Sequence, residues 1–337
     1  MNFTGKQVSA LTASGLVSFL RGPGATLCSA LLLLGFLWMA PEVWSRDLHV
    51  TVLEAPPGQS IEFHAVSPTG RLGGEIKDQQ GSHGLLCPVP CDSQNMRPID
   101  LWFNGEKAVS TQIRSMAVLE EIAGSFSDRK GASHGFVCGG VSSGLRCRQV
   151  DVMMHGTIMT DTLILGMQEH GDLVGSYRDK QAKIHGFLLR NDKFESVEVP
   201  QAIATVVTAI GPLPAGSAPI LTGFFVDAGF AIHGFLCQLP IRSQCFRPFD
   251  VTIDGVPQTM THPVGFTRTQ LVGSFRDKAG ESHGFQCRLP LQPDCFIQLD
   301  VPHGKNTEVF GANEQGQLVG QFYDGTGRPR AFVTHAP

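Results

Sequence analysis

The sequence predicts an all-β protein, a six-bladed β-propeller built from four-stranded antiparallel blades. Three observations lead to this fold class. One segment recurs six times along the 337 residues, each copy has the pattern of a β-hairpin, and the two chain ends complement each other. Repeats of about 50 residues with four short strands each are typical of propeller blades.

The fullest copy of the repeated segment spans Gly273–Cys287, with an Asp and a His on either side of a polar turn. Two short stretches of alternating apolar and polar residues flank this turn, which predicts a hairpin. The His residues, and the Arg that replaces the last one, lie 47 to 51 residues apart. The marker pairs are Asp78 and His83, Asp128 and His134, Asp179 and His185, Asp227 and His233, Asp277 and His283, and finally Asp324 and Arg330.

The spacing also predicts a register for the hairpin. We expect Asp128 to face His134, Phe126 to face Phe136, and Gly124 to face Cys138, all on one side of the pair. Such an Asp–His pair could be a metal site or a catalytic dyad, or a charge-assisted hydrogen bond that holds the turn. A catalytic pair is needed once, whereas this pair occurs five times. We therefore predict structural pairs, no metal and no cofactor.

An inner strand precedes each hairpin, as at Ile61–Val66, and an outer strand follows it, as at Leu299–Pro302. The stretch Leu48–Pro57 resembles the outer strands, whereas the chain stops after a third-type strand near Val333. Pairing of these two ends would close the ring and cover both exposed edges. We expect one propeller domain over residues 46–337.

Residues 1–45 have the pattern of a signal peptide. Lys6 and Arg21 precede an uncharged apolar run over residues 25–40, which is slightly short for a transmembrane helix. We predict a secreted or periplasmic protein cleaved near Ser45. The alternative is a retained signal anchor, which would leave the protein membrane-anchored with an exported domain.

Eight cysteines form four close pairs, each just after a His-Gly-Phe or His-Gly-Leu strand. In repeats with a pair, the acidic residue of the outer strand follows the His by 17 positions, whereas in the repeat without one it follows by 13. This pattern favours disulfides that close the longer loops, and an oxidising compartment. Zinc is the alternative, but no second ligand pair lies at finger-like spacing. The predicted structural disulfides join Cys87 and Cys91, Cys138 and Cys147, Cys237 and Cys245, and Cys287 and Cys295.

The motif Leu-Val-Gly-x-aromatic-x-Asp at Leu173–Asp179 and Leu318–Asp324, followed by His-Gly-Phe and by a strand such as Val197–Pro200, resembles the HAF repeat family of bacterial extracellular proteins. The resemblance covers residues 58–337. It departs from the family in the four cysteine-bearing loops and in Arg330. It implies an exported, propeller-like repeat protein and assigns no catalytic residue.

The net charge of −4 gives no general attraction to nucleic acid. No nucleophile motif, phosphate-binding loop or metalloprotease motif occurs. Polar-Gly turns at Asn104, His155, Asp254 and His303 vary between repeats, and we expect them around the channel mouth as candidate ligand-binding residues.

The sequence therefore favours a non-catalytic binding or interaction scaffold at the cell envelope or outside the cell. We expect a monomer whose partner is an unidentified protein or glycan, with membrane contact only through an uncleaved signal anchor. A propeller hydrolase or lyase that acts on extracellular polysaccharide is the alternative. A purely structural envelope protein is a third hypothesis.

Overall fold

The computed structural model describes residues 45–117, 121–168, 171–211 and 218–335. All of them belong to one compact unit, Val43–Pro337. Their regular structure consists of strands apart from one short 3-10 turn, η1 (Ser243–Cys245), so the predicted all-β class is confirmed. The predicted signal segment lies outside the described residues.

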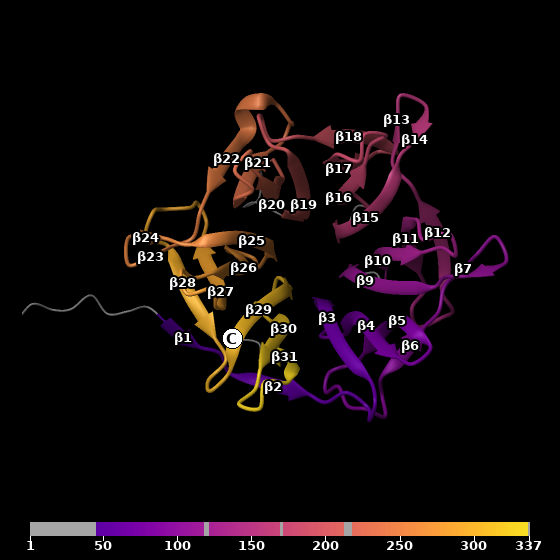
Figure 1. Cartoon of the computed structure of the whole chain (residues 1–337). Coiled ribbons are helices and arrows are strands. Elements are labelled where there is room, and N and C mark those ends of the chain that lie inside the picture. The colour runs from indigo at the N-terminus through magenta and orange to yellow at the C-terminus, as the bar shows by residue number, and fades with distance from the viewer. Residues whose placement is uncertain (1–44, 118–120, 169–170, 212–217, 336–337) are drawn as a thin grey trace, which may run out of the picture. The chain divides into compact units, whose positions relative to one another are not determined.

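Within this unit the strands surround a central axis, and each repeat contributes one strand to the inside (Figure 1). The inner strands are β3 (Ser60–Val66), β9 (Ser110–Met116), β15 (Thr160–Met167), β19 (Ala204–Gly211), β25 (Thr259–Phe266) and β29 (Lys305–Ala312). The second strands are β4 (Leu72–Asp78), β10 (Ile122–Ser127), β16 (Leu173–Arg178), β20 (Ile220–Val226), β26 (Gln270–Arg276) and β30 (Leu318–Tyr323). The third strands are β5 (Gly81–Cys87), β11 (Ser133–Gly139), β17 (Ile184–Arg190), β21 (Ile232–Gln238), β27 (Ser282–Arg288) and β31 (Pro329–Thr334).

The outer strands are β6 (Arg97–Ile99), β12 (Arg146–Val150), β18 (Lys193–Val197), β22 (Phe246–Phe249), β28 (Phe296–Asp300) and β2 (Val50–Leu53). Three small hairpins follow outer strands: β7 (Trp102–Phe103) with β8 (Glu106–Lys107), β13 (Met153–Met154) with β14 (Thr157–Ile158), and β23 (Thr252–Ile253) with β24 (Val256–Pro257). One further strand, β1 (Ser45–Asp47), pairs in parallel with β28.

Hydrogen bonding groups these strands into antiparallel sheets in a propeller-like arrangement. The sheets are three of four strands, one of five and one of eight, besides the small hairpins. The prediction of six four-stranded sheets is therefore confirmed only in part. The eight-stranded sheet joins β3–β6 to β9–β12 through a single parallel bridge between Ser82 and Ser110.

The N-terminal strand completes the last repeat. Residues Val50–Leu53 of β2 pair antiparallel with β31, as the complementary chain ends predict. The side-chain amide of Asn313 also donates a hydrogen bond of 3.0 Å to the carbonyl of Ser67, so the last repeat is tied to the first. Both contacts satisfy polar groups that an open edge would leave to solvent or to another chain.

The predicted hairpin register is wrong by two residues. Phe126 faces His134, Gly124 faces Phe136 and Ile122 faces Cys138. The reason is the turn, in which the Asp128 amide donates to the Ala132 carbonyl and the Asp128 carboxylate accepts from the Lys130 and Ala132 amides. The Asp therefore closes a three-residue loop, and the aromatic side chain, not the Asp, stacks on the His.

The repeated Gly of the second strand makes room for the inner strand, not for a Cys. A Cβ built on Gly175 would overlap the Leu163 carbonyl oxygen, and Gly124 has the same relation to Gln112. These carbonyls project because each inner strand has a β-bulge beside the Gly, at Ile113–Ser115 and Ile164–Gly166 for example. Bulges re-aim the side chain that they leave unpaired.

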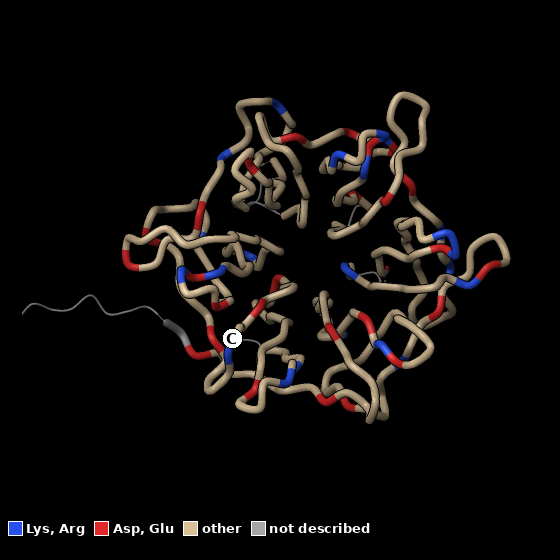
Figure 2. The backbone as a smooth tube through the Cα atoms, in the orientation of Figure 1, with Lys and Arg blue, Asp and Glu red and all other residues tan. Residues whose placement is uncertain are grey.

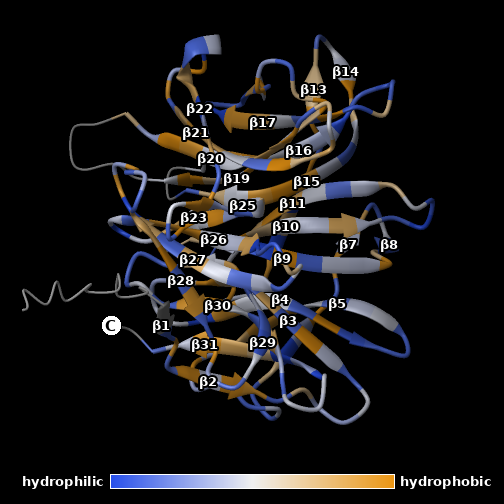
Figure 3. Ribbon diagram, turned by 60° about the vertical axis from the view of Figure 1, so that its left-hand side comes forward, coloured by the Kyte–Doolittle hydropathy of each residue, from blue (hydrophilic) through white to orange (hydrophobic). Residues whose placement is uncertain are grey.

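The core lies between successive sheets. The Phe of the His-Gly-Phe motif is fully buried at Phe136, Phe187, Phe235 and Phe285, and Phe332 takes the same place in the last repeat. Hydrophobic segments lie within the stacked strands and hydrophilic residues dominate many turns (Figure 3). Burial of such aromatic side chains is a main source of stability, at about 1.5–3 kcal/mol for each.

The four predicted disulfides are confirmed: Cys87–Cys91, Cys138–Cys147, Cys237–Cys245 and Cys287–Cys295. Each closes the loop between a third and an outer strand. Such bonds indicate an oxidising, extracytoplasmic environment. Among the described residues no helix is long and apolar enough to cross a membrane.

Candidate functional site

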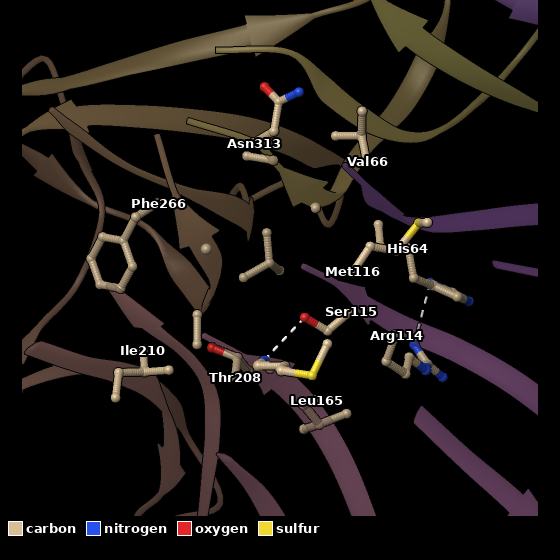
Figure 4. Close-up of a pocket in the computed structure, with 18 of the residues that line it drawn as sticks. His64, Val66, Arg114, Ser115, Met116, Leu165, Thr208, Ile210, Phe266 and Asn313 are labelled. Atoms are coloured by element: carbon tan, nitrogen blue, oxygen red, sulfur yellow. Dashed lines mark hydrogen bonds between the residues drawn. The ribbon is translucent and has the colours of Figure 1, made fainter. Parts of the chain in front are cut away.

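A cavity of about 340 Å³ lies at the centre of the ring. The inner strands line it together with the turns that follow them, represented by Pro68, Gln168 and Glu314. Figure 4 shows side chains from several repeats around this space. The cavity therefore adjoins the turns between first and second strands, on the face opposite the Asp–His hairpin turns.

The bulges place one side chain per inner strand at the cavity. Three of these residues are polar and three are apolar. His64 and Arg114 come from adjacent repeats, whereas Leu165 separates Thr208 from them. The bulged residues are His64, Arg114, Leu165, Thr208, Val264 and Phe310.

The next residue along each inner strand is small, because neighbouring strands approach closely there. A Cβ on Gly311 would overlap the His64 carbonyl, and one on Gly166 would lie 2.9 Å from the Thr208 carbonyl oxygen. Polar side chains bridge the same contacts: Ser115 accepts from the Met167 amide at 3.0 Å, and Thr208 donates to the Pro263 carbonyl at 2.8 Å. The centre is thus held by hydrogen bonds between repeats.

Beside His64 and Arg114 lies a buried cluster around Glu75, which is 2% exposed. Its carboxylate accepts hydrogen bonds from Ser82 at 2.6 Å and from Gln112 at 3.1 Å, and Lys77 lies 3.1 Å away. Burial alone would raise the pKa of Glu75, but contacts with His64, Ser82, Lys77 and Gln112 lower it well below the usual range. Glu75 is therefore ionised, and its carboxylate is occupied by hydrogen bonds from Ser82 and Gln112 and by the Lys77 ammonium.

His64 is neutral. Its Nδ1 accepts from Arg114 at 3.3 Å, which places the proton of the neutral ring on Nε2. That nitrogen points between Glu62 and Glu75, 3.8 Å from each, and makes no hydrogen bond. Burial, followed by the charge of Arg114, lowers the pKa of His64.

The ligand atoms of Glu62, His64 and Glu75 lie within 4.8 Å of one another, which raises the question of a metal. The donor set does not fit one. Lys77 already lies 3.5 Å from Glu62 and 3.1 Å from Glu75. The Nε2 of His64 carries a proton in place of the lone pair that a metal needs. The cluster is compensated by the protein's own cations.

Arg114 differs from the other charges near the axis, where few charged residues lie (Figure 2). It donates to Gln112 at 2.8 Å and to His64, but among the described residues no carboxylate lies within 4.0 Å of it. Arg114 lines the cavity, and its guanidinium lies beside the His64 ring (Figure 4). Arg114 is half-buried, and the charges of Glu75 and Glu62 act on it from beyond ion-pair distance. An anion in the cavity would add a direct ion-pair partner.

His262 lies further along the channel, in a neighbouring cavity that also contains Phe224, Glu308 and Phe310. Its ring packs against Phe224 with centroids 4.6 Å apart. Burial, with a smaller contribution from Arg114, lowers the pKa of His262 to about 4. His262 is therefore neutral near pH 7 and able to accept a proton.

The candidate ligand residues predicted from the sequence do not come together. Asn104, His155 and Asp254 are exposed at the tips of β7–β8, β13–β14 and β23–β24, which point outward from the ring on different sides (Figure 1). His303 is exposed in the turn before β29. All four have positive φ of 50° to 61°, and a Gly follows each, so they serve tight turns. Their expected place at the channel mouth is wrong because these turns follow the outermost strands.

The Asp–His pairs are part of a larger arrangement. Each His lies 2.8–3.5 Å from the turn Asp and also contacts a second acid at the end of the outer strand. These second contacts join His83 to Asp100 at 2.6 Å, His134 to Asp151 at 2.9 Å, His185 to Glu198 at 3.1 Å, His233 to Asp250 at 2.8 Å and His283 to Asp300 at 2.8 Å. The constant spacing of 17 residues in four repeats was the available signal for them.

The sequence interpretation also missed the axial cluster. Glu62 and His64, and Gln112 and Arg114, occupy the same two positions of the first and second inner strands, whereas the third has Leu163 and Leu165 there. Of the six inner strands, only these two have a polar residue at both positions, which was a detectable departure from the repeat.

No protein-family model matches the chain, and no curated protein matches it significantly. Solved structures do match. AofleA from Arthrobotrys oligospora has a TM-score of 0.49 at 8% identity, over 86% of this chain and 87% of its own. The sialidase of Trypanosoma rangeli, seen with sialic acid, has a TM-score of 0.44 at 7% identity over 86% of this chain and 55% of its own. The arabinanase Arb43A of Bacillus subtilis has a TM-score of 0.34 at 12% identity over 86% and 94%. Identities this low say nothing about a shared activity.

Proposed function

We propose that this protein is an exported, non-catalytic binding scaffold whose central cavity takes a small anionic ligand. The observation that carries the proposal is Arg114, which lines the cavity without a carboxylate of the described residues within ion-pair distance. A carboxylate or similar anion would supply the direct ion-pair partner that Glu75 and Glu62 do not provide, through two parallel hydrogen bonds. The cavity volume of about 340 Å³ suits a ligand of monosaccharide size.

The neighbouring groups support binding over turnover. Glu75 accepts from Ser82 and Gln112 and is paired with Lys77, and His64 is held by Arg114. A general acid or base needs a free position toward the substrate and a pKa near the working pH. Neither group satisfies both conditions.

A thermal-shift titration of the full chain with glucuronate, against glucose as the neutral counterpart, tests this function. A ligand that binds only the folded state raises the melting temperature with its concentration. We expect a saturable rise with glucuronate, none with glucose, and loss of the rise in Arg114→Gln. Equal responses to both sugars, or an unchanged response in the variant, would remove Arg114 as the anchor.

The alternative of a polysaccharide hydrolase or lyase has one specific observation in its favour. His262 is neutral because burial lowers its pKa to about 4, and it lies in the cavity next to that of Arg114. A neutral His can accept a proton, although a pKa of about 4 makes His262 a weak base near pH 7. Turnover of an acidic polysaccharide that His262→Ala abolishes would establish this alternative, and absence of product would leave the binding function.

Three further proposals accompany this function. The ring has six blades, because the eight-stranded sheet is joined only by the Ser82–Ser110 bridge and divides there into two units of four strands. The chain is a HAF-type repeat protein, as the ordered motifs suggest. Residues 1–45 direct its export, which the four disulfides support. Peptide sequencing of the exported protein's N-terminus separates cleavage near Ser45 from a retained anchor.

A further inference from the structure

A second and larger cavity, of about 910 Å³, lies between the fourth and fifth repeats. One wall is formed by the outer strand β22 with Arg247–Phe249. The other is formed by Arg268 and Thr269 before β26, and by the end of β27 with the loop Leu289–Pro293. The residues of this groove are remote in sequence from Arg114, and none of them lines the central cavity.

The floor of the groove is apolar. Phe249 and Phe296 stack with centroids 6.0 Å apart, and Leu289, Leu291 and Ile220 complete the lining. The disulfide Cys287–Cys295 closes the loop that carries Leu289 and Leu291. The wall is therefore covalently tied to the sheet, which reduces the ordering that a ligand must impose.

The rim of the groove is basic. Arg247, Arg268 and Arg288 are exposed, and none of them makes an ion pair or side-chain hydrogen bond with the described residues. The only acid in the lining, Asp250, is occupied by His233 at 2.8 Å. Three unpaired guanidinium groups around one groove repel one another and favour an anionic ligand.

We infer that this groove binds an acidic oligosaccharide, with uronic acid units as its ligand class. A sugar ring offers a rigid C–H face to the Phe rings, and its carboxylate offers the planar, two-oxygen partner that Arg prefers. Successive uronic acid units repeat both features along a chain, which matches several Arg residues beside an aromatic floor. The volume lies within the range of specific ligand sites.

This inference is independent of the central cavity. Isothermal titration calorimetry of tetragalacturonate binding to the full chain, at low salt, tests the inference. We expect saturable binding that weakens as salt is added. We also expect at least about a tenfold loss of affinity in the double variant Arg268→Gln and Arg288→Gln, since each removes a charged hydrogen-bond donor.

Two controls keep the outcomes distinct. Arg148 in β12 faces Val137 as Arg247 in β22 faces Leu236, so Arg148→Gln removes an equivalent Arg outside the groove. Arg148→Gln should leave the affinity for tetragalacturonate unchanged, and so should Arg114→Gln. A loss of glucuronate binding in Arg114→Gln would concern the central cavity alone. Absence of tetragalacturonate binding, or equal affinity in the double variant, would overturn the inference. Tighter binding of a tetraglutamate peptide than of tetragalacturonate would assign the groove to acidic peptides and overturn the glycan assignment.

Discussion

The repeated Gly of the second strand gives the sharpest structural prediction. In Gly175→Ala the new Cβ would overlap the Leu163 carbonyl oxygen and lie 2.9 Å from both the Leu163 carbonyl carbon and Phe187 Cε1. Leu163 belongs to a paired inner strand and Phe187 is a fully buried ring, so neither can move away from the new Cβ without a large cost in free energy. We expect a loss of about 3 kcal/mol, at the upper end for overpacked sites.

For a domain of this size, about 3 kcal/mol corresponds to a fall in melting temperature of roughly 5 °C. Circular dichroism melting curves of the full chain would measure it. Gly139→Ala is the control, because Gly139 also lies in a strand, the third strand β11, its φ is not positive, and no atom lies within 4 Å of its virtual Cβ. A melting temperature of Gly175→Ala within about 1 °C of wild type would refute the carbonyl contact as the reason for the repeated Gly.

Three further predictions concern the closure, the disulfides and the His residues. Asn313→Ala removes the buried hydrogen bond to the Ser67 carbonyl and should cost about 1–3 kcal/mol in chemical denaturation; no loss would mean that water replaces the amide. Reduction of the four disulfides should lower stability by about 2 kcal/mol for each small loop. Thiol counting on the exported protein under denaturant should find no free thiol before reduction, and eight free thiols would contradict the assignment. Burial alone would lower the pKa of His283, but Asp300 and Asp277 outweigh it and raise the pKa above the ordinary 6.5. Its contribution to stability is therefore complete below pH 6.5 and is lost as the pH rises through the raised value. Asp300→Asn should flatten this fall in urea-denaturation midpoints between pH 6 and pH 8, and an unchanged pH profile would show that the pair does not titrate as described.

Much of the fold follows from patterns that repeat. Alternation of apolar residues identifies the hairpins, and loop length with paired cysteines identifies the disulfides, because both are local constraints within one repeat. The complementary chain ends predict the pairing of β2 with β31 for a similar reason. The last third strand lacks an outer partner and the first outer strand lacks a third strand, so pairing the two covers both edges.

The register and the site did not follow in the same way. Whether Asp128 faces His134 or Ala132 depends on side-chain hydrogen bonds inside the turn, and counting residues cannot reveal these. His155 and Asp254 look like candidate ligand residues in the sequence because they are polar and vary between repeats. Their positive φ shows instead that they are residues suited to a tight turn. Arg114 and His64 depart from the repeat in the sequence, but only the bulges of the structure show that both line the central cavity.

The central claim is that Arg114 anchors an anionic ligand in a cavity that performs no turnover. A crystal structure of the full chain soaked in glucuronate tests it most directly. We predict an intact sugar in the central cavity, with its carboxylate oxygens about 3 Å from the Arg114 guanidinium. An empty cavity at a saturating concentration, or a cleaved or eliminated sugar in its place, would contradict the claim.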